Sequence, residues 1–147
     1  MRVLTLSLLL IASCLAPACQ KTSAPLTVEN AWIRLSPPGA AATAGYLTIN
    51  NRASDALLIN RVRSEAYGNI EIHESSMTDG KMTMRPVETL LVAPNDSISL
   101  KPGGLHLMLF NPSRTLTDGE SVELTLFDGE RPVAEITAIV ARENPHD

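Results

Sequence analysis

Between residues 26 and 141 the chain shows short stretches in which apolar and polar residues alternate, separated by turn-forming residues. The clearest is 105–110, where Leu105, Leu107 and Leu109 fall on one face while His106 and Met108 fall on the other. An alternation of period two is typical of a half-buried strand. The same pattern, in places approximate, predicts strands over 27–34, 46–49, 57–62, 70–73, 90–92, 98–100, 122–126 and 133–140.

Turn signals divide these predicted strands. The run 36–39, Ser-Pro-Pro-Gly, breaks the chain, and Asp-Gly pairs at 79–80, 118–119 and 128–129 predict tight hairpin turns. No segment between residues 26 and 141 shows a helical period over three turns. The pattern therefore predicts a single all-β domain over residues 27–141, a sandwich or small barrel with Greek-key connections.

The first 26 residues indicate export. Arg2 precedes an apolar stretch, 3–12, that is shorter than the roughly 20 residues needed to span a bilayer, so residues 1–18 are predicted to be a signal peptide. Cys14 ends a lipobox-like sequence at 11–14, whereas Cys19 follows small residues at 16 and 18. Either cysteine is a candidate for lipidation, and residues 19–26 form a polar tether. We expect a periplasmic protein with a lipid anchor.

Composition excludes several function classes. The 147 residues leave room for one domain, and the formal net charge of −4 with no basic cluster argues against nucleic-acid binding, as does an aromatic content of 3%. No cysteine follows Cys19. The predicted domain therefore has no internal disulfide, no thiol nucleophile, no iron–sulfur cluster, no thiolate zinc site and no blue-copper site.

Histidine and methionine are the residues that suggest chemistry. His73 lies on the face of 70–73 opposite Ile70 and Ile72, and a hairpin at 79–80 would bring a methionine from 82 or 84 close to it. His106 and Met108 lie side by side on their own strand. Neutral imidazole and thioether donors suit a soft monovalent ion such as Cu(I), whereas calcium and magnesium prefer oxygen and zinc gains little from thioether.

Simpler interpretations exist for each of these residues. A methionine in a strand is more often a core filler, and a lone histidine is more often hydrogen-bonded than metal-bound. His146, in the polar tail 142–147, is interpreted as solvated, and Trp32 as a core anchor. Three acidic residues are interpreted as solvated charges of strand edges and turns: Glu71, Glu74 and Asp79.

The spacing His73-x10-Met84-x21-His106-x-Met108 resembles the signature of the periplasmic copper A chaperone family, PCu(A)C. Segments 31–39, 44–50 and 103–109 also resemble that family, and the similarity extends over about 28–140. The resemblance implies a cupredoxin-like β-barrel that binds Cu(I) through these four residues. It also implies delivery toward the copper A centre in subunit II of cytochrome c oxidase, with a thioredoxin-like copper assembly factor as a partner.

Two departures from that family bear on the site. Some members carry a Met- and His-rich tail with a second copper site, whereas only His146 is present here. Met82 lies two residues before Met84, on the same face of a regular strand, so Met82 and the more distant Met77 are accessory candidates. We expect a non-enzymatic copper chaperone with a shallow, exposed site. The alternatives are a metal-free envelope β-sandwich for protein contacts and a copper oxidase, for which no carboxylate has a suitable spacing.

Overall fold

The computed structural model describes residues 25–146, and all regular elements in this range are strands. The all-β prediction is therefore confirmed. The eleven strands are β1 (Leu26–Arg34), β2 (Ala42–Asn51), β3 (Leu57–Ile59), β4 (Arg61–Arg63), β5 (Tyr67–Thr78), β6 (Lys81–Pro86), β7 (Leu90–Val92), β8 (Asp96–Leu100), β9 (Leu105–Pro112), β10 (Ser121–Asp128) and β11 (Arg131–Ala141). Within the described range, no helix is long and apolar enough to cross a membrane.

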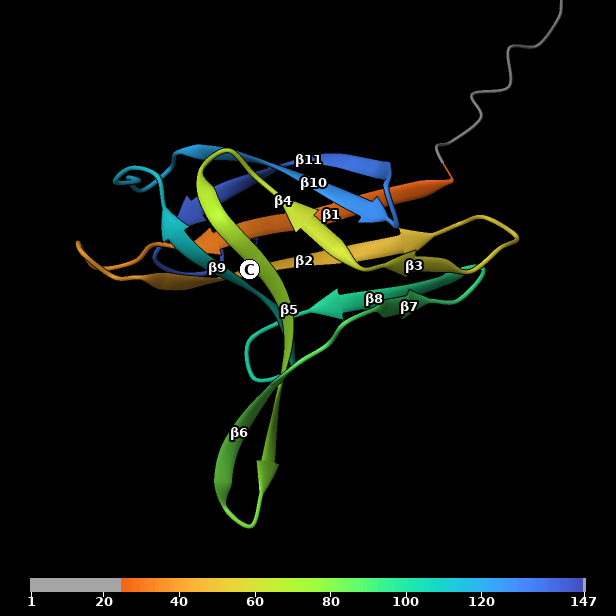
Figure 1. Ribbon diagram of the computed structural model, residues 1–147, viewed down its shortest axis with the longest axis horizontal. Helices are drawn as coiled ribbons and strands as arrows, with labels where there is room; N and C mark the ends of the chain where they lie inside the picture. The colour runs from red at the N-terminus through yellow and green to blue at the C-terminus, as the bar shows by residue number, and fades with distance from the viewer. Residues whose placement is uncertain (1–24, 147) are drawn as a thin grey trace, which may run out of the picture.

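One large sheet carries most of these strands (Figure 1). Its order is β4-β10-β11-β1-β2-β9-β5-β6, with β8 paired to β2 beside this path, while β3 and β7 form a separate two-stranded sheet. β1 runs parallel to β11, and the other pairs are antiparallel. The end strands β4 and β6 do not pair with each other, so the sheet is not a closed barrel.

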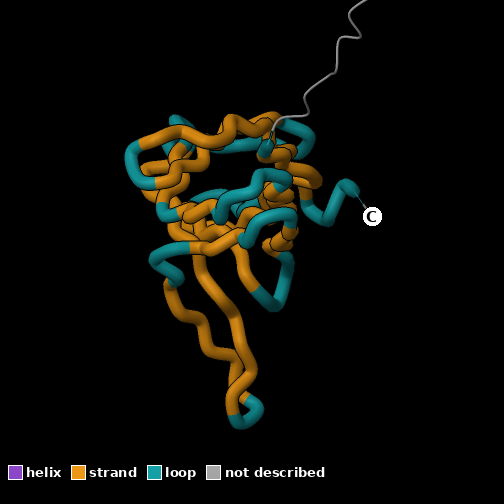
Figure 2. Tube along the Cα trace, turned by 90° about the vertical axis from the view of Figure 1, so that its right-hand side faces the viewer, coloured by secondary structure: helices purple, strands orange, loops and turns teal. Residues whose placement is uncertain are grey.

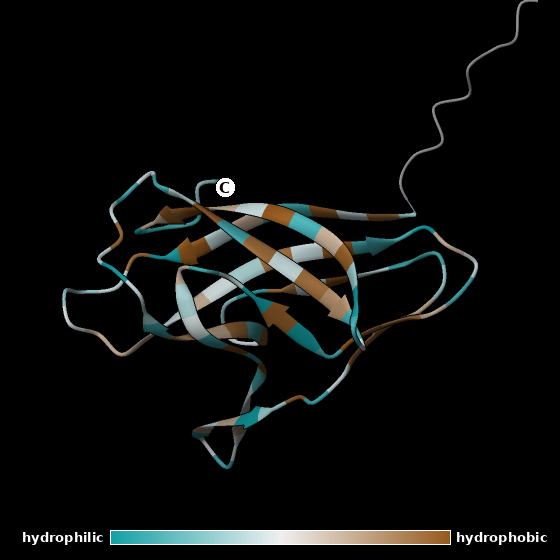
Figure 3. Ribbon diagram, turned by 45° about the horizontal axis from the view of Figure 1, so that its top comes forward, coloured by the Kyte–Doolittle hydropathy of each residue, from teal (hydrophilic) through white to brown (hydrophobic). Residues whose placement is uncertain are grey.

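The main core contains the inward faces that the alternation predicts. Leu107 and Leu109 are 1% and 0% exposed, and Ile70 and Ile72 are also buried, whereas Leu105 is half-buried. Figure 3 shows apolar and polar positions alternating along the strands. Burying a side chain of this size stabilises the fold by about 1.5–3 kcal/mol. The burial of Leu107 and Leu109 thus holds in place the strand whose other face carries His106 and Met108.

A second, smaller cluster lies apart from this core. Trp32, Tyr46 and Ala141 are buried together with half-buried Ala44 packed against them, and the rings of Trp32 and Tyr46 are 4.7 Å apart between centroids. The interpretation of Trp32 as a core anchor is confirmed, and the core that it anchors is this second cluster. The cluster reaches the edge of the candidate site, because Ala44 pairs directly with Met108.

Two sequence predictions are wrong. Residues 57–62 do not form one strand, because Asn60 separates β3 from β4 and its side-chain oxygen accepts a hydrogen bond from the Gly129 N–H at 3.2 Å. The Asp118-Gly119 pair does not close a hairpin either. It lies in the connection between β9 and β10, which do not pair, and the Gly119 N–H donates to the Val140 carbonyl at 2.8 Å.

The Asp-Gly pairs at 79–80 and 128–129 do close hairpins. The hairpin closed by the first pair projects from the body of the molecule. Asp79 and Gly80 have φ values of 50° and 73°, which suits the tight turn between β5 and β6. β5 is much longer than the strand predicted over 70–73. Its second half projects from the body together with β6 (Figure 2). All six residues of β6 are exposed. We call residues 74–86 the projecting hairpin.

Candidate metal centre

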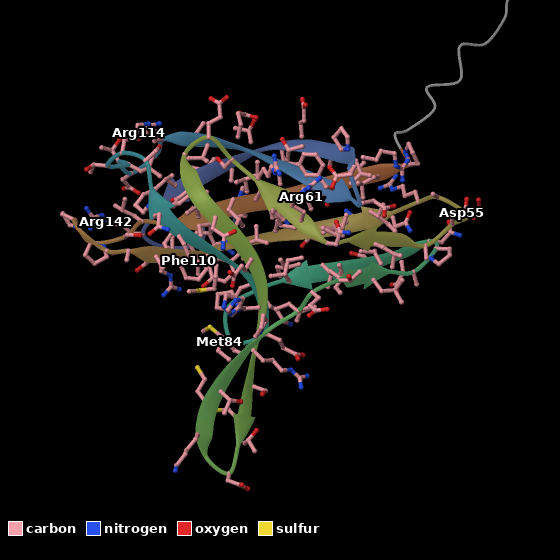
Figure 4. All side chains as sticks on the ribbon, viewed as in Figure 1. Asp55, Arg61, Met84, Phe110, Arg114 and Arg142 are labelled. Carbon is pink, nitrogen blue, oxygen red and sulfur yellow. The ribbon has the colours of Figure 1, made fainter. Side chains whose placement is uncertain are left out.

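The sheet register places the four residues of the sequence motif on one face. β5 lies between β9 and β6, with His73 directly opposite His106 and Ser75 directly opposite Met84. Met108 lies directly opposite Glu71. Glu71 is two residues before His73 and shares its face of β5. Directly paired residues, and residues two apart on a strand, share a face. The motif residues therefore lie together on the face of β9, β5 and β6 opposite the main core. Figure 4 labels one of them, Met84, where the projecting hairpin leaves the body.

His106 is held in one orientation by the backbone. Its Nδ1 lies 2.9 Å from the carbonyl oxygen of Gly104, which also accepts a hydrogen bond from the Ser75 N–H at 3.1 Å. A carbonyl oxygen only accepts hydrogen bonds, so Nδ1 carries the proton and Nε2 of the neutral ring carries the lone pair. His106 is 5% exposed. The expectation of a shallow, exposed site is therefore wrong for this residue.

His73 is held by a carboxylate. Its Nε2 lies 2.8 Å from Oε2 of Glu71, while its Nδ1 is buried and has no hydrogen-bond partner. The hydrogen bond with His73 is the main cause of a lowered pKa for Glu71, so this carboxyl group is ionised at neutral pH and only accepts hydrogen bonds. Nε2 of His73 is then the donor, which leaves the lone pair of the neutral ring on Nδ1.

Glu71 is a site residue that the sequence analysis missed. It was interpreted as a solvated charge, but it contacts His73 and its other oxygen accepts a hydrogen bond from the Asn69 side-chain amide at 2.8 Å. Its position two residues before His73, on the same strand face, was the available signal. A carboxylate bonded to a histidine nitrogen is a common way to orient a metal-binding imidazole. Glu74, by contrast, pairs with Arg85, and His146 is exposed as predicted.

The methionines of the described range lie outside the main core. Met77, Met82 and Met84 are 65%, 66% and 51% exposed, and Met108 is half-buried on the same face. Methionine ordinarily fills gaps in apolar cores. That interpretation is wrong for the three methionines of the projecting hairpin. The register also separates Met84 from Met82, because Met84 pairs with Ser75 near His73 whereas Met82 pairs with Met77 farther along the hairpin.

Aromatic rings border the two histidines. The ring centroids of His73 and His106 are 6.1 Å apart, and that of Phe110 lies 6.4 Å from His73. Phe110 also follows from the strand alternation, since it lies two residues beyond Met108, but the sequence analysis did not name it.

Within residues 25–146, no three histidine, aspartate or glutamate side chains are grouped closely enough to hold a metal ion. Two neutral imidazoles beside thioethers form a donor set that suits a soft monovalent cation.

A comparison with family models matches residues 26–139 to the family described as "Putative lipoprotein LpqE-like". The chain belongs to the LpqE-like family. Two curated relatives are each 28% identical: "Uncharacterized protein RP573" of Rickettsia prowazekii over 106 residues, and "Putative lipoprotein Lxx21020" of Leifsonia xyli subsp. xyli over 100 residues. These alignments cover 71% and 67% of this chain, and 59% of each relative.

Three solved structures share this fold, and two of them are named as PCuAC domains. The apo PCuAC domain from PmoF1 is 25% identical with a TM-score of 0.63, covering 82% of this chain and 95% of that domain. The copper-bound PCuAC domain from PmoF2 is 21% identical with a TM-score of 0.64, covering 82% and 94%. Apo-DR1885 from Deinococcus radiodurans is 24% identical with a TM-score of 0.62, covering 97% of both chains. The predicted resemblance to the PCu(A)C family and the cupredoxin-like fold are confirmed.

Proposed function

We propose that this protein binds one Cu(I) ion through His73, Met84, His106 and Met108 and acts as an extracytoplasmic copper chaperone. The observation that carries the proposal is the unpartnered, buried Nδ1 of His73, on the face where it pairs with His106 and lies near two methionines. A buried nitrogen without a partner costs free energy. A bound metal ion would remove that cost. Two similar structures, the copper-bound PCuAC domain from PmoF2 and CuI-DR1885 from Deinococcus radiodurans, support this choice of ion.

The hydrogen bonds assign a coordinating atom to each histidine. His73 would bind through Nδ1 and His106 through Nε2, because the other nitrogen of each ring donates to Glu71 or Gly104. The thioethers of Met84 and Met108 would complete the set. All four donors are uncharged, so no side chain has to lose a proton to bind. Thioethers also resist the disulfide formation that removes thiols in oxidising compartments.

Copper transfer would then proceed by ligand exchange. Met84 is half-exposed on the projecting hairpin, whereas His106 is buried in the body. An incoming thiolate or imidazole from an acceptor would displace the Met84 thioether first and leave the histidines until last. The acceptors we propose are a thioredoxin-like copper assembly factor and subunit II of cytochrome c oxidase, where the ion would enter the copper A centre.

The proposed location is the periplasm, with residues 1–18 as a signal peptide and residues 19–26 as a tether ahead of the β domain. Residues 1–24, including both candidate lipidation sites, lie outside the described residues. The lipoprotein names of the family and of the Leifsonia relative support a lipid anchor at Cys14 or Cys19. Replacing each cysteine by serine and following the protein in membrane and soluble fractions would identify the anchored residue.

Anaerobic titration with Cu(I) in competition with a chromophoric chelator tests the proposed function. We expect one tightly bound ion, a large loss of affinity in His73→Ala and His106→Ala, and no change in the control His146→Ala. A protein that competes for no copper would instead be a metal-free interaction module. Copper-dependent oxygen consumption with an added reductant would indicate the copper oxidase.

A further inference from the structure

The tip of the projecting hairpin carries two methionines that the proposed centre does not use. Met77 and Met82 are a directly opposed cross-strand pair, and both side chains are about two-thirds exposed. Directly opposed residues in an antiparallel ladder have Cβ atoms about 4.5–5.5 Å apart. Two flexible thioethers at that spacing can reach one ion between them.

Packing does not account for this pair. The tip has no core beneath it, since all of β6 is exposed, and a β-branched or aromatic pair would favour a strand more than methionine does. The two faces of the tip also differ in chemistry. On the other face, the hydroxyl groups of Ser76 and Thr83 lie 3.1 Å apart in a hydrogen bond. On one face of the tip, two hydroxyl groups are thus hydrogen-bonded to each other, whereas the other face carries the thioethers of Met77 and Met82.

The pair is too far from the histidines to belong to the same coordination sphere. Met77 is four positions beyond His73 along β5, a distance of about 13 Å at the rise of a strand. Met84 lies between the two places on the same face, about 7 Å from Met82 by the same rise. The thioethers on this face therefore form a row from the tip of the hairpin to the candidate centre.

We propose that Met77 and Met82 form a second, weaker Cu(I) site that captures the ion at the tip and passes it through Met84 to the histidine centre. This inference rests on the proposed function. At each step one thioether lone pair leaves the metal as the next donor arrives, so copper remains Cu(I) and no proton moves. Asp79 in the turn and Lys81 directly after it carry opposite charges and together add no net charge, so the thioethers are the groups that attract the ion.

The test is an anaerobic NMR titration of the full chain, labelled with ¹³C at the methionine methyl groups, with Cu(I) supplied in acetonitrile. We expect the first equivalent to shift the signals of Met84 and Met108, and the second to shift those of Met77 and Met82 together. The double variant Met77→Leu, Met82→Leu should keep the first event and its affinity, lose the second event, and load its first equivalent more slowly.

The matched control is Ser76→Ala with Thr83→Ala, which changes the polar face of the same tip and should keep both events. The inference is overturned if the first equivalent binds while the Met77 and Met82 signals stay unshifted at excess Cu(I); the proposed function then stands. It is also overturned if the control pair loses the second event as the methionine pair does. If the tip signals shift while His73→Ala and His106→Ala leave the affinity unchanged, the tip site stands and the proposed centre fails.

Discussion

At the scale of single residues, the two histidines of the candidate centre are prepared in different ways. The backbone carbonyl of Gly104 fixes the His106 ring, whereas a charged side chain, Glu71, fixes the His73 ring. The Gly104 carbonyl belongs to the backbone of the turn before β9 and cannot be removed by a side-chain substitution, whereas the Glu71 carboxylate can. His73 is therefore the histidine whose tautomer depends on one replaceable residue.

This dependence predicts the effect of changing Glu71. In Glu71→Ala the proton of neutral His73 loses its acceptor, so we expect the ring to populate both tautomers and Cu(I) affinity to fall. Glu71→Gln keeps an acceptor oxygen and should restore much of the tautomer preference without the charge. Imidazole ¹⁵N shifts of the apo protein measure the tautomer directly. Glu74→Gln is the control, and equal effects from both positions would contradict a positioning role for Glu71.

Neighbouring positions on β9 separate binding from folding. Met108→Leu keeps volume and apolarity but removes the sulfur, so apo stability should change by less than about 1.5 kcal/mol while Cu(I) affinity falls. Leu107→Ala removes a fully buried side chain and should cost roughly 2–5 kcal/mol with the donor set intact. Urea denaturation and chelator competition measure the two quantities. The reverse pattern would mean that the metal site lies on the other face of β9.

The sequence predicted these faces because alternation along one strand is local information. The alternation within 105–110 placed His106 and Met108 on the strand face away from the buried leucines, and it required no information about neighbouring strands. It did not predict that Glu71 would contact His73, nor that Met77 would pair with Met82. These contacts depend on side-chain rotamers and on the exact register of the hairpin, and neither follows from a hydrophobic pattern.

At the scale of elements, the projecting hairpin is the part of the centre with the least support. No residue of β6 is buried, so the strand itself is held by its turn and by its cross-strand bonds to β5. Met84 nevertheless comes from β6, while the histidines come from the body strands β5 and β9. The geometry of the proposed centre therefore depends on a tight turn several residues away.

Strain at that turn should weaken copper binding without unfolding the protein. Gly80 has a φ of 73°, where a Cβ atom costs about 1–2 kcal/mol, so Gly80→Ala should loosen the projecting hairpin. We expect faster amide hydrogen exchange in 77–84, lower Cu(I) affinity and a nearly unchanged unfolding midpoint. Gly39→Ala is the matched control, since Gly39 has a φ of 82° and equally open surroundings. A loss of affinity in both variants would exclude a specific effect of the hairpin.

The three Asp-Gly pairs show what a turn motif can and cannot predict. The pairs at 79–80 and 128–129 lie between strands that are neighbours in the sheet, so each closes a hairpin. The pair at 118–119 has the same sequence, but β9 before it pairs with β2 and β5 while β10 after it pairs with β4 and β11. Which strands pair with each other depends on the packing of the whole sheet. A two-residue turn motif carries no information about it.

At the scale of the whole molecule, the candidate centre and the main core lie on opposite faces of the same strands. His73 and Ile72 are chain neighbours that point to different sides of β5, as His106 and Leu107 do on β9. The apolar core can therefore hold the apo fold while ligands exchange at the proposed centre, first at the exposed Met84. A copper chaperone benefits when its binding site is separate from its core, because the release of the ion then leaves the folding stability of the protein largely unchanged.

Surface carboxylates contribute to the response of the apo protein to acid. Glu120 accepts a hydrogen bond from the Thr117 N–H at 2.9 Å and pairs with Arg114, and Glu130 is bonded to Arg61 at 3.1 Å. These contacts lower the pKa of both carboxyl groups below the ordinary value of 4.5. A lowered folded-state pKa gives stability that is fully present above the unfolded-state pKa and is lost as the pH falls through the folded-state value.

The apo protein should therefore lose thermal stability as the pH falls below about 4.5, where the unfolded chain takes up protons more readily than the folded one. Glu120→Gln mimics the protonated side chain at every pH, so its Tm should lie below that of the wild type near neutrality and converge with it in acid. Calorimetry across this range measures the difference. Glu143→Gln, on the exposed C-terminal segment, is the control and should follow the wild type throughout. A Glu120→Gln curve parallel to the wild type at all pH values would show that this carboxylate does not contribute to acid sensitivity, and that other carboxylates, such as Glu130 beside Arg61, account for it.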